Sequence, residues 1–351
     1  MAPLDQLLGV AAENYSPGVR EMACRLSLNG AFVPAGENLA RTAQLSISPS
    51  ALRDLVEREG RRVEQAIRGG HYGPDWTAED CTDQTLITGA DGVMVPLVTA
   101  EQKHKRRQTE AKNRKEQGRQ STAKPGRPRG GSDGAYKEFK IVSFYDPDKS
   151  HTYAVGTSGN HVALGRMMRR EAGKLRIDRA RRKYSVTDGA EWIAKQYARQ
   201  LPMLDENILD YYHLRDHVIA AGQVLYGEGT PQGRVWREEM MGYVWTQGSL
   251  VMLDRLGNYL RRHPSGPKSE ALKSLREYVA KRVNMTDYPS YRQAGYDCGS
   301  GPTESFCGTL TARLKGRGMH WDKDNAEAMM ALGSLHYSNL WQNYWAKQRA
   351  A

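Results

Sequence analysis

The sequence predicts an α/β protein, with a mixed-sheet core that is interrupted by a helical insertion and preceded by an all-α N-terminal domain. Three observations support this fold class: helical patterning over residues 1–70, strand patterning from about residue 84, and helical, aromatic-rich sequence over residues 217–297. A chain of 351 residues can form two or three domains with cores of their own. Its 39% apolar and 26% charged residues are typical of a globular protein.

The composition also limits the compartment and the partners. No apolar run approaches the ~20 residues of a membrane-spanning helix, and the N-terminal MAPLDQLLGV lacks the pattern of a signal peptide. The four cysteines, Cys24, Cys81, Cys298 and Cys307, are scattered and form no CxxC pair. We therefore expect a cytoplasmic protein without a membrane partner, whose cysteines are buried thiols. The formal charge of +11 indicates a polyanionic partner, and nucleic acid is the first candidate.

Residues 1–70 are expected to form a helical DNA-binding domain. Two Ser-Pro pairs, at residues 16–17 and 48–49, combine the N-cap serine and first-turn proline that start a helix. Helix, short turn and capped helix is the layout of a helix-turn-helix. A small helical bundle used for dimerisation is the alternative, because the last of these helices carries several acids: Asp54, Glu57, Glu59 and Glu64.

Residues 84–216 have the pattern of the first part of a sheet core. Strands are predicted over TLITGADGVMVPLV, KEFKIVSFYD and HTYAVG, followed by a helix over residues 161–175. RKYSVTDGAEWIAKQYARQ then predicts strand, turn and helix, and NILDYYH a last short strand. The helical insertion covers residues 217–297, and residues 298–351 return to the core as its final helices.

A basic insertion, residues 101–134, separates the first two predicted strands. Residues 103–129 contain eleven Lys and Arg side chains against two acids, Glu110 and Glu116. In a DNA-handling protein such a segment neutralises backbone phosphates and makes affinity salt-dependent. In other proteins it is a solvated, flexible insertion, and both interpretations stay open. Under the DNA-binding interpretation, four residues in particular are expected to contact DNA: Lys103, Lys105, Arg106 and Arg107.

Three carboxylates are the candidate catalytic residues. Asp91 ends or interrupts the first strand, in GADGVMVPL, and Asp188 lies at the end of a later strand, in YSVTDGAEW. Glu304 opens a helix directly after a Gly-Ser-Gly-Pro turn. Mg²⁺ prefers oxygen ligands, and two such ions about 4 Å apart promote phosphoryl transfer. The alternatives are ordinary Asp-Gly turns and a glutamate that complements the helix dipole.

The helix that begins near Glu304 is expected to carry the basic residues that follow it. Glu304 and Lys315 lie eleven residues apart and therefore share one face of a helix. In this arrangement Glu304 points to the metal while Lys315 reaches a phosphate about three turns away. Arg313, Lys315 and Arg317 together form the predicted phosphate track.

Four blocks of sequence resemble, in order, the blocks of DDE-type transposases of bacterial insertion sequences, in the Kra-type group: GADGVMVP, VTDGAEWI, ILDYYHLRDHV and GSGPTESFCGTLTARLKGRGMHW. The resemblance extends from about Leu4 to the last helix, and the final block is the most specific. It implies an RNase H-like catalytic core in which Asp91, Asp188 and Glu304 bind two Mg²⁺ ions, with Mn²⁺ as a substitute.

The resemblance also implies that Asp210 and His213 support the active site. Together they look like the acid-or-Cys, two residues, His element of mutator-like relatives, which lies near the active site. Taken alone, His213 is better explained as a structural hydrogen-bonding residue. Asp210, His213 and His217 have a helical spacing that could suit zinc, an interpretation that we do not favour.

For function, the resemblance implies a transposase that acts on double-stranded DNA in the bacterial cytoplasm, associated with the nucleoid. Such an enzyme binds the terminal repeats of its own element as a dimer or larger assembly, cleaves there, and joins the ends to target DNA. The alternatives are an RNase H-like endonuclease that cleaves without joining, and a catalytically idle helix-turn-helix regulator. The basic insertion is longer than in the relatives that this resemblance suggests.

Overall fold

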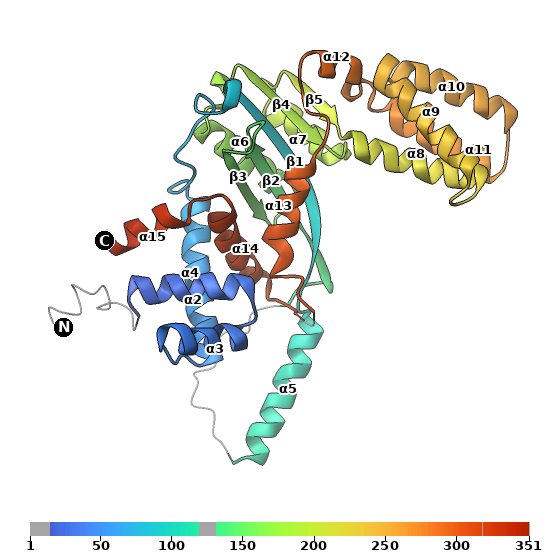
Figure 1. The fold of residues 1–351 in the computed structure, drawn as a ribbon. Helices are drawn as coiled ribbons and strands as arrows, with labels where there is room; N and C mark the ends of the chain where they lie inside the picture. Colours follow the sequence, from blue (N-terminus) through green and yellow to red (C-terminus); the bar gives the residue numbers. More distant parts are fainter. Residues whose placement is uncertain (1–14, 119–130, 318, 351) are drawn as a thin grey trace.

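A five-stranded mixed sheet forms the centre of the protein (Figure 1). The computed structural model describes residues 15–118, 131–317 and 319–350. The strands are β1 (Thr85–Pro96), β2 (Tyr136–Tyr145), β3 (Thr152–Thr157), β4 (Arg182–Thr187) and β5 (Glu206–Leu209). Their order is β3-β2-β1-β4-β5, with β2 antiparallel to its two neighbours and β4 parallel to both β1 and β5. The α/β class and the mixed sheet that the sequence predicts are confirmed.

Helices connect the parallel strands and cover the sheet. Parallel neighbours need crossover connections, and two helices supply them: α6 (His161–Lys174) before β4 and α7 (Glu191–Gln200) before β5. The chain ends in three helices: α13 (Gly301–Ala312), α14 (Lys323–Tyr337) and α15 (Trp341–Ala350). Helix α14 protects the edge strand β3, because the N–H of Ala154 donates to Ser338 Oγ at 3.0 Å and Ser334 Oγ donates to the carbonyl of Ala154.

The N-terminal helices share their core with the sheet. They are α2 (Pro17–Asn29), α3 (Phe32–Ala43) and α4 (Pro49–Arg68). The predicted N-caps are present, since Ser16 and Ser48 accept hydrogen bonds from the backbone of the first turns of α2 and α4. Helix α4 lies against α14 so closely that a Cβ on Gly60 would stand 2.6 Å from the carbonyl oxygen of Ala328. One face of the helix that a helix-turn-helix would use for recognition is therefore covered, while residues such as Arg53 and Arg58 on that helix are exposed. The segment before Tyr15 lies outside the described residues.

The interface between α4 and α14 contains a carboxyl group with an unusual pKa. Burial raises the pKa of Glu64 to about 7, against the lowering effect of Arg68, while the nearby charges of Glu327 and Asp324 raise it. Arg68 lies 2.8 Å from both Glu64 and Glu327. The folded protein therefore binds a proton at Glu64 more tightly than the unfolded chain does. The stability that this proton contributes is present below pH 4.5 and is lost as the pH rises through about 7.

Replacing Glu64 with Gln should remove this pH dependence. The difference in free energy of unfolding between the variant and the parent should grow in favour of the variant by about 1–2 kcal/mol from pH 5 to pH 7.5. This change is smaller than the full linkage value because water reaches part of the Glu64 side chain. Urea unfolding at the two pH values measures the change. Glu277→Gln, at an exposed position, is the control. An equal stability difference between Glu64→Gln and the parent at both pH values would contradict the assignment.

The helical insertion forms a unit beside β4 and β5 (Figure 1). Its helices are α8 (Tyr211–Tyr226), α9 (Pro231–Gln247), α10 (Ser249–Arg262), α11 (Pro267–Ala280) and α12 (Tyr288–Gln293). Trp236 and Leu256 are buried in a hydrophobic cluster that the insertion shares with strands β1, β2, β4 and β5, and Tyr243, Trp245 and Leu253 pack against that cluster. These aromatic residues therefore help to form the core that joins the insertion to the sheet.

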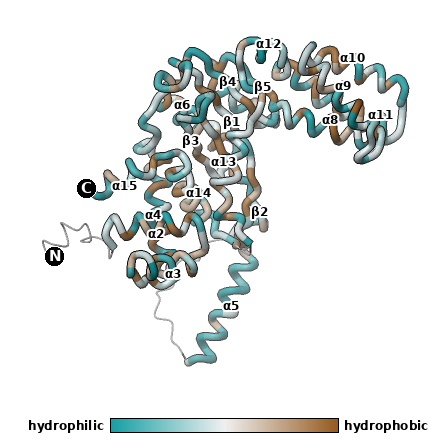
Figure 2. The backbone as a smooth tube through the Cα atoms, viewed as in Figure 1, coloured by the Kyte–Doolittle hydropathy of each residue, from teal (hydrophilic) through white to brown (hydrophobic). Residues whose placement is uncertain are grey.

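The first part of the basic insertion is a helix rather than the flexible segment that one interpretation expects. Helix α5 (Ala100–Glu116) starts with a capping box between Thr99 and Gln102 and has no buried residue. It projects from the body (Figure 1) and is hydrophilic along its length (Figure 2). Four basic positions of the insertion lie outside the described residues: 119, 124, 127 and 129.

Two further predictions concern the cysteines and the membrane. All four cysteines are buried free thiols, as the sequence predicts. Within the described part of the chain, no helix combines the length and apolar character needed to cross a membrane.

Candidate active site

The fold brings the three predicted acids onto neighbouring elements. Strands β1 and β4 are adjacent and parallel, so Asp91 on β1 and Asp188, directly after β4, belong to neighbouring strands. Glu304 lies in the first turn of α13, which packs against β1 and β2. One detail of the prediction is wrong: Asp91 neither ends nor interrupts the first strand but lies within it, paired with Ile141 of β2. The strand continues through the weak β-formers around Asp91 because β2 pairs with it without a break from Ile87 to Pro96.

The electrostatics of Asp91 show how close the three acids are. Burial raises the pKa of Asp91 above its usual value, against the lowering effect of the Gly92 N–H at 2.6 Å. The negative charges of Asp188 and Glu304 raise it further, while a hydrogen bond from Cys307 lowers it. Among the described residues, none of the three carboxylates has an ion pair with Lys or Arg within 4.0 Å. Such a cluster of like charges is unfavourable unless a cation joins it.

A glycine in the sheet allows Glu304 to come near Asp91. Gly89 precedes Asp91 by two residues and therefore faces the same side of the sheet. A Cβ at Gly89 would stand 2.0 Å from Oγ1 of Thr303, the residue just before Glu304. Thr303 is itself buried and its Oγ1 lies 2.8 Å from Ser143 Oγ on β2. Sequence reasoning missed this contact, although a glycine inside a predicted strand is a known sign of close backbone approach.

Asp210 fixes the turn that precedes Glu304. Its carboxylate, with the residue 2% exposed, accepts a hydrogen bond from the N–H of His213 at 2.8 Å and another from the N–H of Ser300. Ser300 Oγ in turn donates to Glu304 Oε1 at 3.1 Å. Asp210 thus connects the start of α8 with the start of α13, in agreement with its predicted supporting role.

The side chain of His213 has different neighbours from those of Asp210. Its ring lies 5.3 Å from that of His217, and the His217 ring stacks on Tyr278 at 3.7 Å. Burial lowers the pKa of His217, and the charges of His213 and Arg282 lower it further. These rings therefore belong to an aromatic cluster that joins α8 to α11, and Asp210 points its carboxylate to the backbone instead.

The helical insertion holds the loop that carries Asp188. Arg282 donates from Nε to the carbonyl of Gly189 at 2.9 Å, and Tyr278 donates from its hydroxyl to the carbonyl of Asp188 at 3.2 Å. The guanidinium of Arg282 also lies 3.8 Å from the centre of the Tyr278 ring. Gly189 adopts a φ of +72°, and a Cβ there would stand 2.6 Å from Arg282 Nε and Leu209 Cδ1. The sequence gives no sign of this contact, since residues 189 and 282 are far apart in the chain.

Removing the Arg282 side chain should loosen Asp188 without unfolding the protein. On the hypothesis that the three acids bind Mg²⁺ in a site that acts on DNA, we expect Arg282→Ala to lower the activity about 10- to 100-fold and to raise the Mg²⁺ concentration needed for half-maximal activity. DNA affinity should stay the same, because Arg282 acts on the loop rather than on DNA. Lys281→Ala, next in sequence and exposed, is the matched control. A parallel loss of DNA binding, or an unchanged Mg²⁺ requirement, would contradict the positioning role.

The predicted phosphate track is only partly a surface feature. Helix α13 ends at Ala312, so the basic residues follow the helix rather than lie on it. Arg313 is half-buried: Nε donates to the carbonyl of Ser27 at 2.8 Å, and the guanidinium lies about 5 Å from the rings of Phe32 and Trp321. Burial lowers its pKa to about 10. Lys315 and Arg317 are exposed and remain available to a phosphate.

The four basic residues predicted to bind DNA from the insertion all lie on α5. Lys105 is exposed and forms a surface ion pair with Glu101 at 2.7 Å. Lys103, at the base of the helix, forms an ion pair with Asp322. Arg106 and Arg107 line a cavity at that base. Their side chains and Arg313 therefore meet in one region, although they are some two hundred residues apart in sequence.

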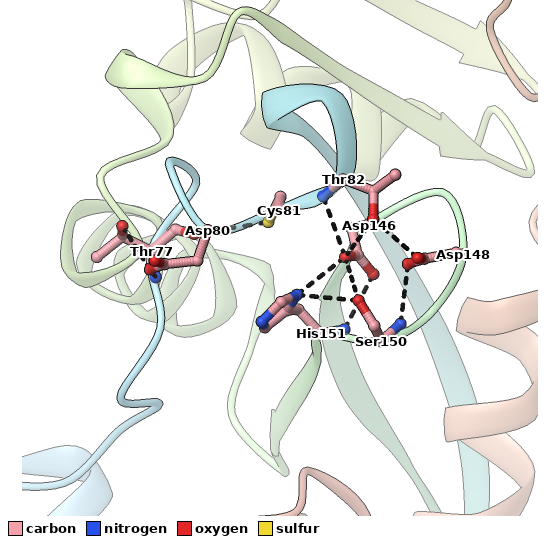
Figure 3. A network of polar contacts seen from close by, with 8 residues as sticks. All are labelled: Thr77, Asp80, Cys81, Thr82, Asp146, Asp148, Ser150 and His151. Atoms are coloured by element: carbon pink, nitrogen blue, oxygen red, sulfur yellow. Dashed lines mark hydrogen bonds and ion pairs between the residues drawn. The ribbon is translucent and has the colours of Figure 1, made fainter.

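A second polar cluster, remote from the three acids in the fold, is a structural network (Figure 3). Ligand atoms of Cys81, Asp146 and His151 lie within 4.8 Å of one another. The Asp146 carboxylate accepts hydrogen bonds from Ser150 Oγ at 2.8 Å, His151 Nδ1 at 3.0 Å and the backbone N–H of His151. Burial raises the pKa of Asp146, but these hydrogen bonds lower it overall. Since the carboxylate is already saturated, the cluster serves to fasten the β2–β3 turn, and its thiol is not a ligand that Mg²⁺ prefers.

Comparison with known proteins does not assign the chain to a family. No model of a protein family and no curated protein matches the chain. The function is therefore inferred from the sequence blocks and the geometry of the site.

Proposed function

We propose that the chain is a DDE-type DNA transposase with an RNase H-like catalytic core. The observation that carries this proposal is the meeting of Asp91, Asp188 and Glu304 on β1, after β4 and on α13. A sheet of order β3-β2-β1-β4-β5, with its first three strands antiparallel and the next two parallel, agrees with such a core. The four sequence blocks support the same class, because three of them contain these acids and the other contains Asp210.

The three acids fit Mg²⁺ as their cation. Their ligand atoms are all carboxylate oxygens, the type that Mg²⁺ prefers. The pKa of Asp91 is raised, and none of the described Lys or Arg residues forms an ion pair with it. Asp91, Asp188 and Glu304 would hold the metal, and Mn²⁺ should substitute for it. When bound, Mg²⁺ supplies activation of the attacking oxygen and stabilisation of the leaving oxygen.

The chain itself orients these ligands and carries the nucleic acid. Arg282 and Tyr278 restrain the Asp188 loop, while Asp210 and Ser300 restrain Glu304. In cleavage, a water oxygen attacks the phosphorus and the bond to the O3′ atom breaks, which leaves a 3′-hydroxyl and a 5′-phosphate. In strand transfer, that 3′-hydroxyl attacks a phosphodiester of target DNA. Both steps break and form one P–O bond each, so no oxidant or energy-rich cofactor is needed.

The same proposal includes the cellular location and the partners of the protein. It would act in the bacterial cytoplasm, on the nucleoid, on double-stranded DNA from its own element and from the target, and as a homodimer or larger assembly.

A strand-transfer assay tests the proposal. Duplex DNA carrying the sequences that flank the gene is incubated with the protein, Mg²⁺ and a supercoiled target plasmid. We expect both nicked ends and joined products, and neither with Asp188→Asn. Cleavage without joining would assign an RNase H-like nuclease, and DNA binding without either reaction would assign the regulator.

A further inference from the structure

We propose that a cavity between α4, α5 and the segment after α13 binds backbone phosphates of double-stranded DNA, about two thirds of a helical turn from the bond that is cut. This inference rests on the proposed function, since it takes the three acids as the site of cleavage. The cavity has a volume of about 630 Å³. Its basic lining residues come from three separate parts of the chain: Arg53, Lys103, Arg106, Arg107, Arg313 and His320.

The acids in the lining already have basic partners, so the cavity keeps a positive balance. They form three ion pairs: Asp322 with Lys103, Glu110 with Arg114, and Glu57 with Arg61. The guanidinium of Arg106 forms no ion pair or hydrogen bond with another residue of the described chain. An arginine in this position has its planar group of donors available for a phosphate, which accepts two of them at once.

One wall of the cavity is held in place by aromatic packing. Arg313 is fixed between Phe32 and Trp321 and by its hydrogen bond to Ser27. Its charge is therefore a preformed feature of the wall rather than a mobile surface charge. A fixed positive charge binds an anion without the entropy cost of ordering a long side chain.

The distance from the acids to the cavity sets how far along the DNA the contact lies. Val98, which lines the cavity, follows Asp91 by seven residues of mostly extended chain, or about 23 Å at roughly 3.3 Å per residue. Phosphates of one DNA strand are spaced about 3.4 Å along the axis, so about seven base pairs separate the two positions. A duplex that lies along β1 and α13 would then reach the cavity and, beyond it, the projecting helix α5 (Figure 1).

Two charge-matched double variants test the cavity. In an Asp188→Asn background, which binds but does not cut, Arg53→Ala with Arg106→Ala removes one cavity charge from α4 and one from α5. Lys112→Ala with Lys115→Ala removes the same charge from the outer end of α5. Binding of a 30-base-pair duplex, with one element end and a fluorescent label, is measured by anisotropy over a series of salt concentrations. All four residues have exposed side chains, so circular dichroism should show unchanged folding.

We expect the cavity variant to lose about 10- to 30-fold in affinity and about two units of salt slope. The outer variant should lose less than about threefold. Ethylation interference should show that the lost contacts are phosphates about seven base pairs from the cut. Equal losses for both variants, or interference elsewhere, would overturn the inference. Absence of cleavage by the parent chain, with cavity-dependent binding intact, would contradict the proposed function alone.

Discussion

Asp91→Asn is expected to act in opposite directions on catalysis and on stability. DNA cleavage and strand transfer should fall on the order of 10³-fold or more, because one ligand of the metal is lost. The metal-free protein should become more stable than the parent at pH 7.5. The cause of the gain is the raised pKa of Asp91: the folded state favours the protonated form, so its ionised charge costs stability above that pKa. Asparagine is neutral at every pH and avoids this cost.

Thermal unfolding with and without Mg²⁺ measures this prediction. Added Mg²⁺ should raise the melting temperature of the parent, because the metal binds the folded chain, and should leave that of Asp91→Asn unchanged. Asp216→Asn, at an exposed position on α8, is the control and should behave as the parent does. If Asp91→Asn is less stable than the parent without metal, or if it keeps normal activity, the three acids do not form a metal site.

Gly89→Ala is expected to damage the site through the fold. The new methyl group would stand 2.0 Å from Thr303 Oγ1, so α13 must move away from β1 and carry Glu304 with it. We expect a loss of about 1–3 kcal/mol in stability and at least about 10²-fold in activity, because a small misplacement of a catalytic group is costly.

A second glycine provides the matched control for Gly89. Gly308 lies on α13 itself, and a Cβ there meets no other atom within 4 Å. Gly308→Ala should therefore keep full activity and gain about 0.5–1 kcal/mol from the higher helix propensity of alanine. Urea unfolding and the cleavage assay compare the two. Normal activity in Gly89→Ala would show that the approach of α13 to β1 does not set the position of Glu304.

Local features of the sequence predicted much of this fold. The Ser-Pro pairs cap α2 and α4 as expected, and segments rich in β-forming residues located the strands, since both signals depend on neighbours in the chain. The sequence singled out the three acids by their places at strands and at a helix start and by the resemblance, and their shared catalytic role stays a prediction. The packing of α4 on α14 was not predictable, since both faces are simply apolar in the sequence and only the fold pairs them.

The supporting residues of the site show the same limit. Arg282 looks like any surface arginine in sequence, and its role depends on α11 being folded back onto the loop after β4. Arg313 was predicted as a phosphate contact, but the sequence did not show that Phe32 of α3 and Trp321 after α13 hold it half-buried in the wall of a cavity. Contacts of this kind depend on tertiary structure, so spacing along the chain carries no information about them.

Anomalous diffraction from crystals soaked in Mn²⁺ tests the central claim most directly. The account predicts one or two Mn²⁺ peaks bounded by the carboxylates of Asp91, Asp188 and Glu304, and none there in Asp188→Asn. A parent crystal without a peak between these three side chains, or with Mn²⁺ bound at the Cys81, Asp146 and His151 cluster instead, would contradict it.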